Sequence, residues 1–308
     1  MKVGIFYSSI SNPAKFSNKI SLMDNFAQGV QSVGDIAIDF RDRTLYNESL
    51  DAGVVLGYTL ENNHRRQIIN QLQRTGTPAI FVDSNILHYA RSEHEWHRYS
   101  LNSVYPNDGI YFFTDLDRDK WTRYSGWHQT SLKPWRQGND QQHILIFCQR
   151  PRGWNMFGND QDAWLQRTIA RIRRIEPRRP IVVRMHPGDG ARQIQIDKIK
   201  QLYCAKDKVT VSTSNNIRDD LKNCWCTVGY NSTPNVVAVI EGVPAYIEDP
   251  AHSWATDVAF NDLKMIKDPP MPDRSEWIHK IANIHWSNEE VRTGQLWSAI
   301  RQYISSAR

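Results

Sequence analysis

Residues 223–249 contain the pattern that most limits how this chain can fold. An apolar run ends at Val228 and is followed by a polar turn at residues 229–232, a helical pattern at residues 233–241 and a second apolar run at residues 245–247. Neighbouring parallel strands need a crossover connection, and this connection is usually a helix. The stretch therefore predicts a strand–helix–strand unit of an α/β domain.

The start of this predicted helix has features that favour binding of an anion. Ser232 or Thr233 can cap the helix, Pro234 suits its first turn, and Gly242 suits a left-handed helix end. A helix that begins directly after a strand presents N–H groups and the positive end of its dipole beyond the sheet, where phosphate groups bind. Any strand–helix–strand unit of an α/β domain could show the same pattern, so this stretch alone does not establish a function.

A second segment, upstream of the first, carries two basic side chains in a comparable position. In residues 180–190, PIVVRMHPGDG, an apolar strand pattern continues into Arg184, His186 and a Pro-Gly-Asp-Gly turn. Open α/β sheets bind their ligands at the carboxyl ends of parallel strands. We therefore expect a guanidinium and an imidazole at the ligand-binding edge of the sheet.

Together, the two segments resemble the C-terminal, nucleotide-sugar-binding half of GT-B glycosyltransferases. The similar motifs are R-x-H-P at residues 184–187 and an Asn-Ser-Thr turn followed by Glu-Gly-x-Pro within residues 231–244. Bacterial capsule-type transferases and polyglycerol-phosphate transferases carry such motifs, although here the glycine follows the glutamate directly, which departs from their spacing. The resemblance covers about residues 140–260. It implies a nucleotide-sugar donor, such as UDP-glucose, and no cofactor.

The resemblance also implies which residues bind the donor. Cations and dipoles stabilise the negative charge on a departing nucleoside diphosphate. The implied donor-binding residues are Arg150, Arg184, His186, Tyr230, Asn231, Ser232, Thr233 and Glu241. In the resemblance, Glu241 corresponds to a glutamate that hydrogen-bonds a donor hydroxyl. Its alternative role is that of a surface carboxylate at the C-terminal end of the helix.

The first half of the chain alternates between strand and helix patterns. Alternation of this kind predicts a doubly wound parallel sheet, and the lack of a G-x-G-x-x-G sequence argues against a dehydrogenase. The predicted elements are strands at residues 2–7, 53–58, 79–82 and 110–113 and helices at residues 22–34 and 62–74.

The predicted fold class is therefore α/β, with two Rossmann-like domains facing a cleft (GT-B). We place an N-terminal, acceptor-side domain at residues 1–138 and the nucleotide-sugar-binding domain at residues 139–288. A C-terminal helix at residues 289–308 is expected to cross back to the first domain.

An inverting transferase needs a base for the acceptor hydroxyl. Asp83 ends the apolar strand pattern at residues 79–82, and His88 follows it. The order VVLGY, a helix and then PAIFVDSNIL is similar to a stretch of phage DNA β-glucosyltransferases, in which the aspartate that ends this strand is the base. Asp83 is therefore the implied catalytic base and His88 the next candidate, with a simple cap as the alternative role of Asp83.

Composition limits the remaining classes of protein. The chain is 40% hydrophobic and 23% charged, as folded soluble proteins are, and no run approaches the length of a transmembrane span. The amino-terminal residues MKVGIFYSS become polar too soon for a signal peptide, so we expect a cytoplasmic protein, in the host cytoplasm if a phage encodes it. The four cysteines lack a zinc-binding spacing, and we expect no metal.

The charge of the chain bears on the acceptor. A net charge of +5 and a pI near 9.0 suit an anionic donor or an anionic polymer. Seven arginines lie within residues 167–184; a solvated helix face is the ordinary explanation and a phosphate-facing surface the other. These features lead us to expect a hydroxymethylated pyrimidine in phage-type DNA as the acceptor. The alternatives are a transferase for a surface polysaccharide or polyol-phosphate polymer, and a noncatalytic nucleic-acid-binding protein on a transferase scaffold.

Overall fold

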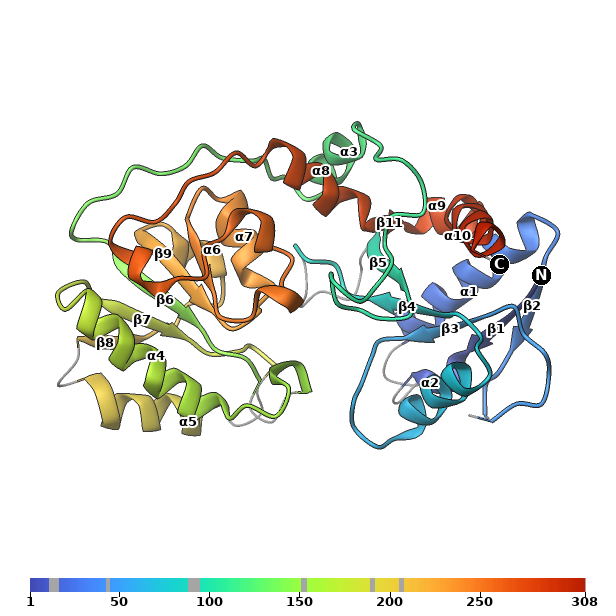
Figure 1. The fold of residues 1–308 in the computed structure, drawn as a ribbon, viewed down its shortest axis with the longest axis horizontal. Coiled ribbons are helices and arrows are strands. Elements are labelled where there is room, and N and C mark those ends of the chain that lie inside the picture. The colour runs from blue at the N-terminus through green and yellow to red at the C-terminus, as the bar shows by residue number, and fades with distance from the viewer. Residues whose placement is uncertain are drawn as a thin grey trace. The chain divides into compact units, whose positions relative to one another are not determined.

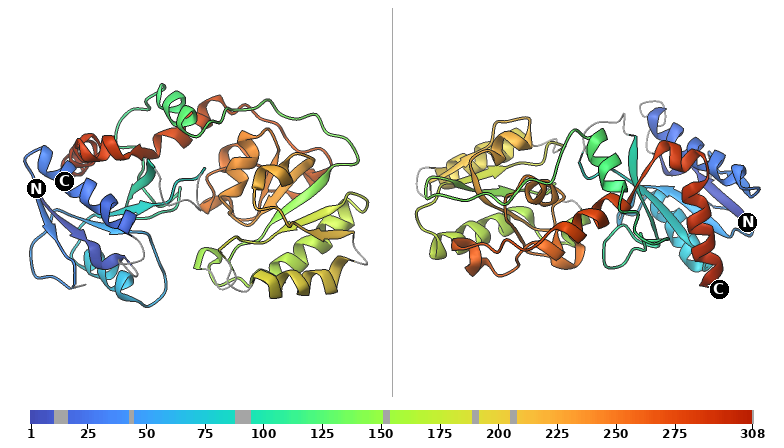
Figure 2. Two further views of the ribbon diagram at one scale, coloured as in Figure 1. Left: turned by 180° about the vertical axis from the view of Figure 1, so that it is seen from behind. Right: turned by 90° about the horizontal axis from the view of Figure 1, so that it is seen from above.

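The computed structural model describes residues 1–10, 17–42, 45–87, 95–150, 154–188, 192–204 and 208–307. The chain forms two compact units, Met1–His128 with Ile278–Arg308 and, between them in sequence, Gln129–Trp277 (Figures 1 and 2). The sequence-based limits at residues 138 and 288 lie further along the chain. At the first boundary, the N–H of Lys133 already bonds to the carbonyl of Ile240 in the second unit, at 2.9 Å. At the second, Nδ2 of Asn283 already bonds to the carbonyl of Asp117 in the first unit, also at 2.9 Å.

The first unit is built on a six-stranded sheet with the order β11-β5-β4-β3-β1-β2. Strands β1 to β4 run parallel, β5 runs antiparallel to β4, and β11 runs antiparallel to β5. Every residue of β3 and β5 is buried, as expected for strands that are covered on both faces. The strands are β1 (Lys2–Phe6), β2 (Ile36–Asp39), β3 (Ala52–Leu56), β4 (Ala79–Asp83), β5 (Trp96–Leu101) and β11 (His285–Ser287).

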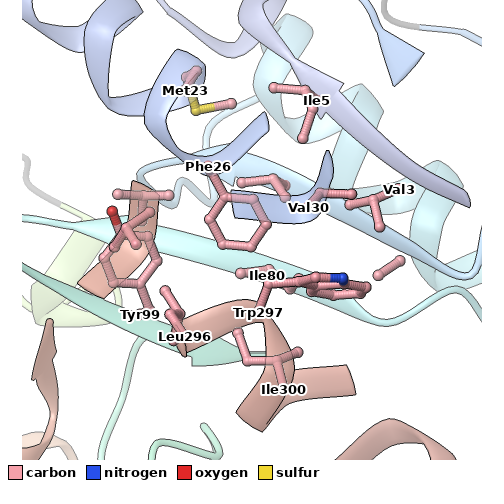
Figure 3. Packing of buried hydrophobic residues seen from close by; sticks show 14 of the residues in the cluster. Val3, Ile5, Met23, Phe26, Val30, Ile80, Tyr99, Leu296, Trp297 and Ile300 are labelled. Atoms are coloured by element: carbon pink, nitrogen blue, oxygen red, sulfur yellow. The ribbon is translucent and has the colours of Figure 1, made fainter. Parts of the chain in front are cut away.

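Helices from both ends of the chain share the core of the first unit. Helix α1 packs against α9 and α10, and Figure 3 shows Phe26 of α1 beside Trp297 of α10. The rings of Phe26 and Trp297 meet edge to face with centroids 6.2 Å apart, and the indole N–H of Trp297 donates to Asp35 at 2.8 Å. The helices are α1 (Ser17–Ser32), α2 (His64–Arg74), α3 (Lys120–Trp127), α8 (Ser275–Asn283, which starts before the division), α9 (Asn288–Arg292) and α10 (Gln295–Ser306).

The second unit is built on a five-stranded sheet that is parallel throughout, with the order β10-β9-β6-β7-β8. Its first strand in sequence, β6, lies at the centre. The chain adds β7 and β8 on one side of β6 and then returns to add β9 and β10 on the other. We call the place between β6 and β9 the reversal point. The strands are β6 (His143–Phe147), β7 (Ile181–Arg184), β8 (Val209–Val211), β9 (Cys224–Gly229) and β10 (Ala245–Ile247).

Helices cover both faces of this second sheet. Figure 1 shows α4 and α5 on one face and α6 and α7 on the other. The side chain of Asp160 caps α4 by accepting the N–H of Ala163 at 2.7 Å, and the apolar side of α4 buries Ile169 and Ile172 in the core. The helices are α4 (Gln161–Ile175), α5 (Arg192–Ile199), a π-helical turn (Lys200–Cys204), α6 (Ile217–Leu221) and α7 (Pro234–Ile240).

The two sheets confirm the prediction of two Rossmann-like domains, but details of the first unit differ. Residues 110–113 form no strand, and Ile110 makes only an isolated bridge to Leu101. The sequence prediction also missed β2 and β5, because β2 is short and partly exposed and β5 buries His, Arg and Tyr side chains among its apolar ones. No helix in the described part of the chain is both long and apolar enough to cross a membrane.

Candidate functional site

Two loops leave the second sheet side by side at the reversal point. Phe147, the last residue of β6, pairs with Gly229, the last residue of β9. The chain continues from β6 into residues 148–150 and from β9 into residues 230–233. In open α/β sheets, ligands bind at the carboxyl ends of the strands where the strand order reverses. These two loops are therefore the place to look for a ligand site.

Side-chain amides link the two loops. Nε2 of Gln149 donates to Oδ1 of Asn231 at 2.7 Å, and Nδ2 of Asn155 donates to Oε1 of Gln149 at 2.6 Å. Nδ2 of Asn231 donates to the main-chain oxygen of Asn155 at 2.9 Å and to Oδ2 of Asp249 at 3.2 Å. Because each bond uses one defined end of an amide, the orientation of these side chains is fixed. Among these residues the sequence had predicted only Asn231; the others are ordinary loop residues whose meeting depends on the fold.

The start of α7 lies in the same loop. Gly229 lets the Asn235 side chain approach the backbone there, since an added Cβ would lie 2.4 Å from Nδ2 of Asn235. Ser232 is buried and its carbonyl accepts the N–H of Asn235 at 3.0 Å. Thr233 is the N-cap residue of α7 but makes no capping bond with its side chain, so the predicted cap is not formed by Thr233. The N–H groups of Asn235 and Val236 in the first helical turn are instead bonded to the carbonyls of Ser232 and Thr233.

Arg150 and His186 lie close together around Gly188, beyond the ends of β6 and β7. Nδ1 of His186 accepts the N–H of Gly188 at 3.0 Å, which leaves the proton of the neutral ring on Nε2. A Cβ added to Gly188 would lie 2.5 Å from a guanidinium nitrogen of Arg150 and 3.2 Å from the His186 ring. The glycine thus lets a guanidinium and an imidazole approach the same stretch of backbone. N–H groups of these two kinds are suited to the oxygens of a phosphate.

Arg184, which the sequence assigned to the donor, is engaged in a buried ion pair. Its Nη1 lies 2.5 Å from Oδ2 of Asp220, and the two side chains are only 10% and 11% exposed. The same nitrogen donates to the carbonyl of Ser214 at 3.0 Å, and the hydroxyl of Ser212 donates to Asp220 at 2.8 Å. Arg184 therefore holds the loop that follows β8, whereas Arg150 and His186 meet around Gly188.

Glu241 is the C-cap residue of α7, a helix about 10 Å long, and so lies at the opposite end of α7 from Ser232. Its side chain is 4% exposed and is surrounded by three basic residues. Nε of Arg218 lies 2.9 Å from Oε1, Nη2 of Arg136 lies 3.7 Å from Oε2, and the ammonium of Lys133 also bonds to Oε2. Neither reading of the sequence anticipated this cluster, since Glu241 is neither a surface carboxylate nor a neighbour of the other donor candidates.

Tyr230 connects the loop after β9 to residues 154–159. Its hydroxyl accepts from Nδ2 of Asn159 at 2.9 Å, and its ring meets Trp164 edge to face. Partial burial raises the pKa of Tyr230, and the neighbouring carboxylates of Asp249 and Glu248 add to this shift. The phenol consequently keeps its proton at neutral pH and can donate a hydrogen bond as well as accept one.

In the first unit, Asp83 ends β4 and forms an ion pair with Arg98. Nη2 of Arg98 lies 2.6 Å from Oδ2 of Asp83; the aspartate side chain is 31% exposed and the arginine side chain 8%. Oδ1 of Asp83 accepts the N–H of Ser84 at 2.7 Å. A carboxylate oxygen can accept more than one hydrogen bond, so these contacts leave capacity for a ligand hydroxyl. His88, the other candidate base, lies outside the described residues.

A buried polar network fixes the loop that follows Asp83. Oδ1 of Asn85 accepts from the Tyr124 hydroxyl at 2.7 Å, and Nε2 of His285 accepts the N–H of Ile86 at 3.2 Å. Nδ1 of His285 donates to a main-chain carbonyl at 2.7 Å, which sets its tautomer. Burial, together with nearby cations, lowers the pKa of His285 well below its usual value, so the ring stays neutral. These residues come from separate elements and gave no sequence signal.

Most of the arginines within residues 167–184 have partners in the protein. Besides Arg184, Arg171 lies 3.0 Å from Glu248, and Arg173 donates to the carbonyl of Arg179 at 2.8 Å. Arg179 is buried with its guanidinium 4.0 Å from the centre of the Trp225 ring. The other three arginines of the run, Arg167, Arg174 and Arg178, are exposed. The run therefore gives less support to a DNA-binding surface than its sequence suggested.

Known proteins resemble this chain in structure and not in sequence. No protein-family model matches it, and no curated protein sequence does. KpsC from Thermosulfurimonas dismutans, described as a beta Kdo 2,4 transferase, superimposes with a TM-score of 0.55 at 15% identity, over 91% of this chain and 89% of KpsC. A second KpsC structure from this organism, described as a beta Kdo 2,7 transferase, gives a TM-score of 0.54 at 11% identity, over 96% and 99%. This chain shares the fold of both proteins. The predicted similarity to GT-B glycosyltransferases is thus confirmed for the fold.

Proposed function

We propose that the protein is a glycosyltransferase that takes a sugar from a nucleotide-sugar donor. The observation that carries the proposal is the polar site at the reversal point, in a fold shared with two Kdo transferases. Transfer breaks the bond between the anomeric carbon and a phosphate oxygen of the nucleotide and forms a bond from that carbon to an acceptor oxygen. The phosphate leaves with the bonding electrons, and a base takes the proton of the acceptor hydroxyl.

We assign the phosphate part of the donor to Arg150, His186 and the N–H groups of Ser232 and Thr233. Positive and dipolar groups there stabilise the charge that develops on the leaving phosphate. Tyr230 and Asn231 shape the same loop through their contacts with Asn159, Asn155 and Gln149. Arg184 is a positioning residue in this proposal, and Glu241 stabilises the far end of α7. In the first unit, Asp83 is the proposed base.

For the acceptor, we favour a sugar hydroxyl, as in assembly of a surface polysaccharide, over a base in DNA. The arginine run was one of the features that favoured DNA, and four of its seven members have partners within the protein. The descriptors 2,4 and 2,7 of the two matched transferases denote the sugar positions joined by a glycosidic bond. A hydroxymethylated pyrimidine in DNA is the second candidate, supported by the net charge of +5 and by the exposed Arg167, Arg174 and Arg178.

Thermal unfolding of the purified protein with a panel of nucleotides and nucleotide sugars, including UDP-glucose and activated Kdo, tests the donor site. A ligand at a hundred times its Kd adds about 2.7 kcal/mol to the stability, which raises Tm by several degrees. We expect one nucleotide to raise Tm, and Arg150→Ala or His186→Ala to abolish the rise. Arg74→Ala, an exposed arginine of the other unit, serves as the control.

The donor identified in this way is then offered with oligosaccharides and with hydroxymethylated DNA, and the product is detected by mass. Transfer to either acceptor class supports the enzyme and decides between the two. If no nucleotide raises Tm and the protein instead binds DNA in a salt-sensitive manner, the transferase proposal is wrong and the noncatalytic nucleic-acid-binding alternative replaces it.

A further inference from the structure

An aromatic ring sits at the tip of a tight turn beside the candidate donor site. Phe157 and Gly158 have φ values of 51° and 81°, and the N–H of Asn159 bonds to the carbonyl of Met156 at 2.9 Å. Positive φ at both central residues is the pattern of a type I′ turn, in which Asn, Asp and Gly dominate the central positions. A bulky residue with positive φ is a true conformational outlier. Phenylalanine is thus kept at a position that its backbone disfavours.

The ring of Phe157 is both exposed and supported. The residue exposes 40% of its surface, and its ring lies against His252 with centroids 4.2 Å apart and planes inclined by 33°. Nδ1 of His252 lies 2.9 Å from Oδ2 of Asp249; a carboxylate only accepts, so the ring nitrogen donates and the imidazole is held in place. Asp249 also accepts from Asn231. The amides at the reversal point therefore orient the ring that supports Phe157.

A second connection ties the turn to the loop after β9. Nδ2 of Asn159 donates both to the carbonyl of Met156 and to the hydroxyl of Tyr230, each at 2.9 Å. The turn is thus closed on itself and attached to Tyr230 by the same amide. The bond from Asn159 to Tyr230 holds the turn that carries Phe157, and the ring of His252 packs against the Phe157 ring. The position of this exposed ring is therefore fixed from two sides.

We propose that Phe157, supported by His252, is the surface on which the base of the nucleotide donor stacks. The inference rests on the proposed function, because it takes the ligand of this site to be a nucleotide. Stacking on an aromatic side chain suits any base, since every base has a π face. Conformational outliers of this kind cluster at active sites and ligand-binding sites. Phe157 and His252 bind the base end of the donor, while Arg150 and His186 bind its phosphate end.

The distances between strands agree with this assignment. Strands β9 and β7 are both neighbours of β6, so their ends lie two strand spacings apart, about 10 Å. The turn at Phe157 is attached at the β9 end through Tyr230, and His186 follows β7. Gln149 follows β6, the strand between these two ends, and its amide bonds to Asn231 in the loop after β9.

The test compares Kd values for two probes, measured by calorimetry on the full chain. One probe is the nucleotide that stabilises the wild type most; the other is ribose 5-phosphate, which carries a phosphate and a sugar but no base. The variants are Phe157→Leu, which removes the π face, Phe157→Tyr, which keeps it, and Phe157→Asn, which removes it while suiting a positive φ. Phe112→Leu is the matched control, because Phe112 is 43% exposed and lies in the other unit.

We expect Phe157→Leu and Phe157→Asn to weaken nucleotide binding about tenfold. Binding of ribose 5-phosphate by these variants should stay within about twofold, while Phe157→Tyr and Phe112→Leu bind both probes like the wild type. Unchanged nucleotide binding by Phe157→Leu and Phe157→Asn would overturn the stacking surface and leave the transferase proposal standing. An equal loss for both probes would also overturn it, since the ring would then act through the turn and not on a base. If the wild type binds no nucleotide, both proposals fall together.

Discussion

Nε2 of Gln149 and Oδ1 of Asn231 are 2.7 Å apart, and this bond joins the loop after β6 to the loop after β9. The two strands flank the reversal point of the second sheet, so the bond sets the separation of two loops that approach a ligand from neighbouring strands. Asn231 also contacts Asn155 and Asp249. The site is thus held together mainly by neutral amides, with the charged groups at its margins.

Asn231→Ala should weaken the site without unfolding the protein. The change removes one acceptor and two donor contacts and leaves Gln149, which is 5% exposed, without one partner, at a cost of about 1–3 kcal/mol in stability. We expect the midpoint of urea unfolding to fall accordingly and nucleotide affinity to drop at least tenfold. Asn107→Ala, an exposed asparagine of the other unit, should change neither quantity. Wild-type affinity in Asn231→Ala would show that the amide network does not shape the donor site.

Arg184→Ala should act on stability. Removing one partner of a buried ion pair costs about 3–5 kcal/mol, because the charge of Asp220 is left buried without a cation. We expect a large loss in urea unfolding experiments, and a smaller loss in the double variant Arg184→Met with Asp220→Leu, which removes both charges. The double variant should still bind nucleotide. Loss of nucleotide binding with wild-type stability would instead support the donor contact that the sequence implied.

Glu241→Gln separates the two roles considered for this carboxylate. The glutamine keeps the shape but removes the charge that Lys133, Arg136 and Arg218 share, so we expect a loss of about 2 kcal/mol in the free energy of unfolding. Nucleotide-sugar affinity, measured well below Tm, should remain within twofold of the wild type. A selective loss of affinity for the nucleotide sugar, with no loss for the nucleotide alone, would mean that Glu241 contacts the sugar.

Asp83→Asn tests the proposed base. The change removes the proton acceptor while it preserves the size of the side chain, and general-base catalysis typically contributes 10²–10⁴-fold to the rate. We expect kcat for transfer to fall by at least about 100-fold, with donor Kd unchanged. Asp117→Asn is a control in the same unit, since Asp117 also forms an ion pair with an arginine. If the two changes lowered kcat equally, Asp83 would be only the ion-pair partner of Arg98 and not the base.

Lys120 should make stability depend on pH. Burial lowers its pKa from 10.5 to about 8, although its ammonium lies 3.5 Å from Glu290. Between about pH 8 and pH 10.5 the unfolded chain therefore binds a proton that the folded chain lacks, so this group makes stability rise with pH across that window. Urea unfolding of wild type and Lys120→Met should give free energies whose difference grows in favour of the wild type as pH rises.

The same difference should be constant below about pH 8, where Lys120 is protonated in both states. Other groups titrate above pH 8 as well, which is why the comparison with Lys120→Met is needed. Lys280→Met, an exposed lysine, should show no such change. Parallel curves for wild type and Lys120→Met would show that this lysine has an ordinary pKa in the folded protein.

The second unit could be predicted from sequence because its signals are local. Residues 223–249 form β9, α7 and β10 in the predicted order, and the apolar run before Arg184 is β7. Parallel strands buried on both faces leave continuous apolar runs, and Pro and Gly mark the helix ends between them. β5 left no such run, since it buries His97, Arg98 and Ser100. Its place depends on partners far along the chain, including His285 of β11, which pairs with Arg98.

The candidate site shows the same difference between features with a local sequence signal and features that depend on distant residues. Position along the chain was enough to place Arg150, His186 and Asn231 at the ends of strands, because that follows from the strand pattern. The ion pairs of Arg184 and Glu241 could not be predicted from the sequence, because their partners Asp220 and Lys133 are set by folding. Phe157 did carry a local signal, since Phe-Gly-Asn has glycine in the second central position of a turn. The phenylalanine concealed it, because asparagine is the residue that such turns favour.

The first unit is made of two separate segments, Met1–His128 and Ile278–Arg308, and this sets the order in which the two units can fold during translation. All strands and sheet-covering helices of the second unit are continuous in sequence and can assemble once residue 277 has left the ribosome. The first unit lacks β11, α9 and α10 at that stage, so the side of α1 that carries Phe26 has no partner in Trp297. Domains generally fold from the amino terminus as synthesis proceeds. Within this chain, the first unit is therefore begun before the second unit and completed after it, and until then Phe26 lacks the ring that covers it.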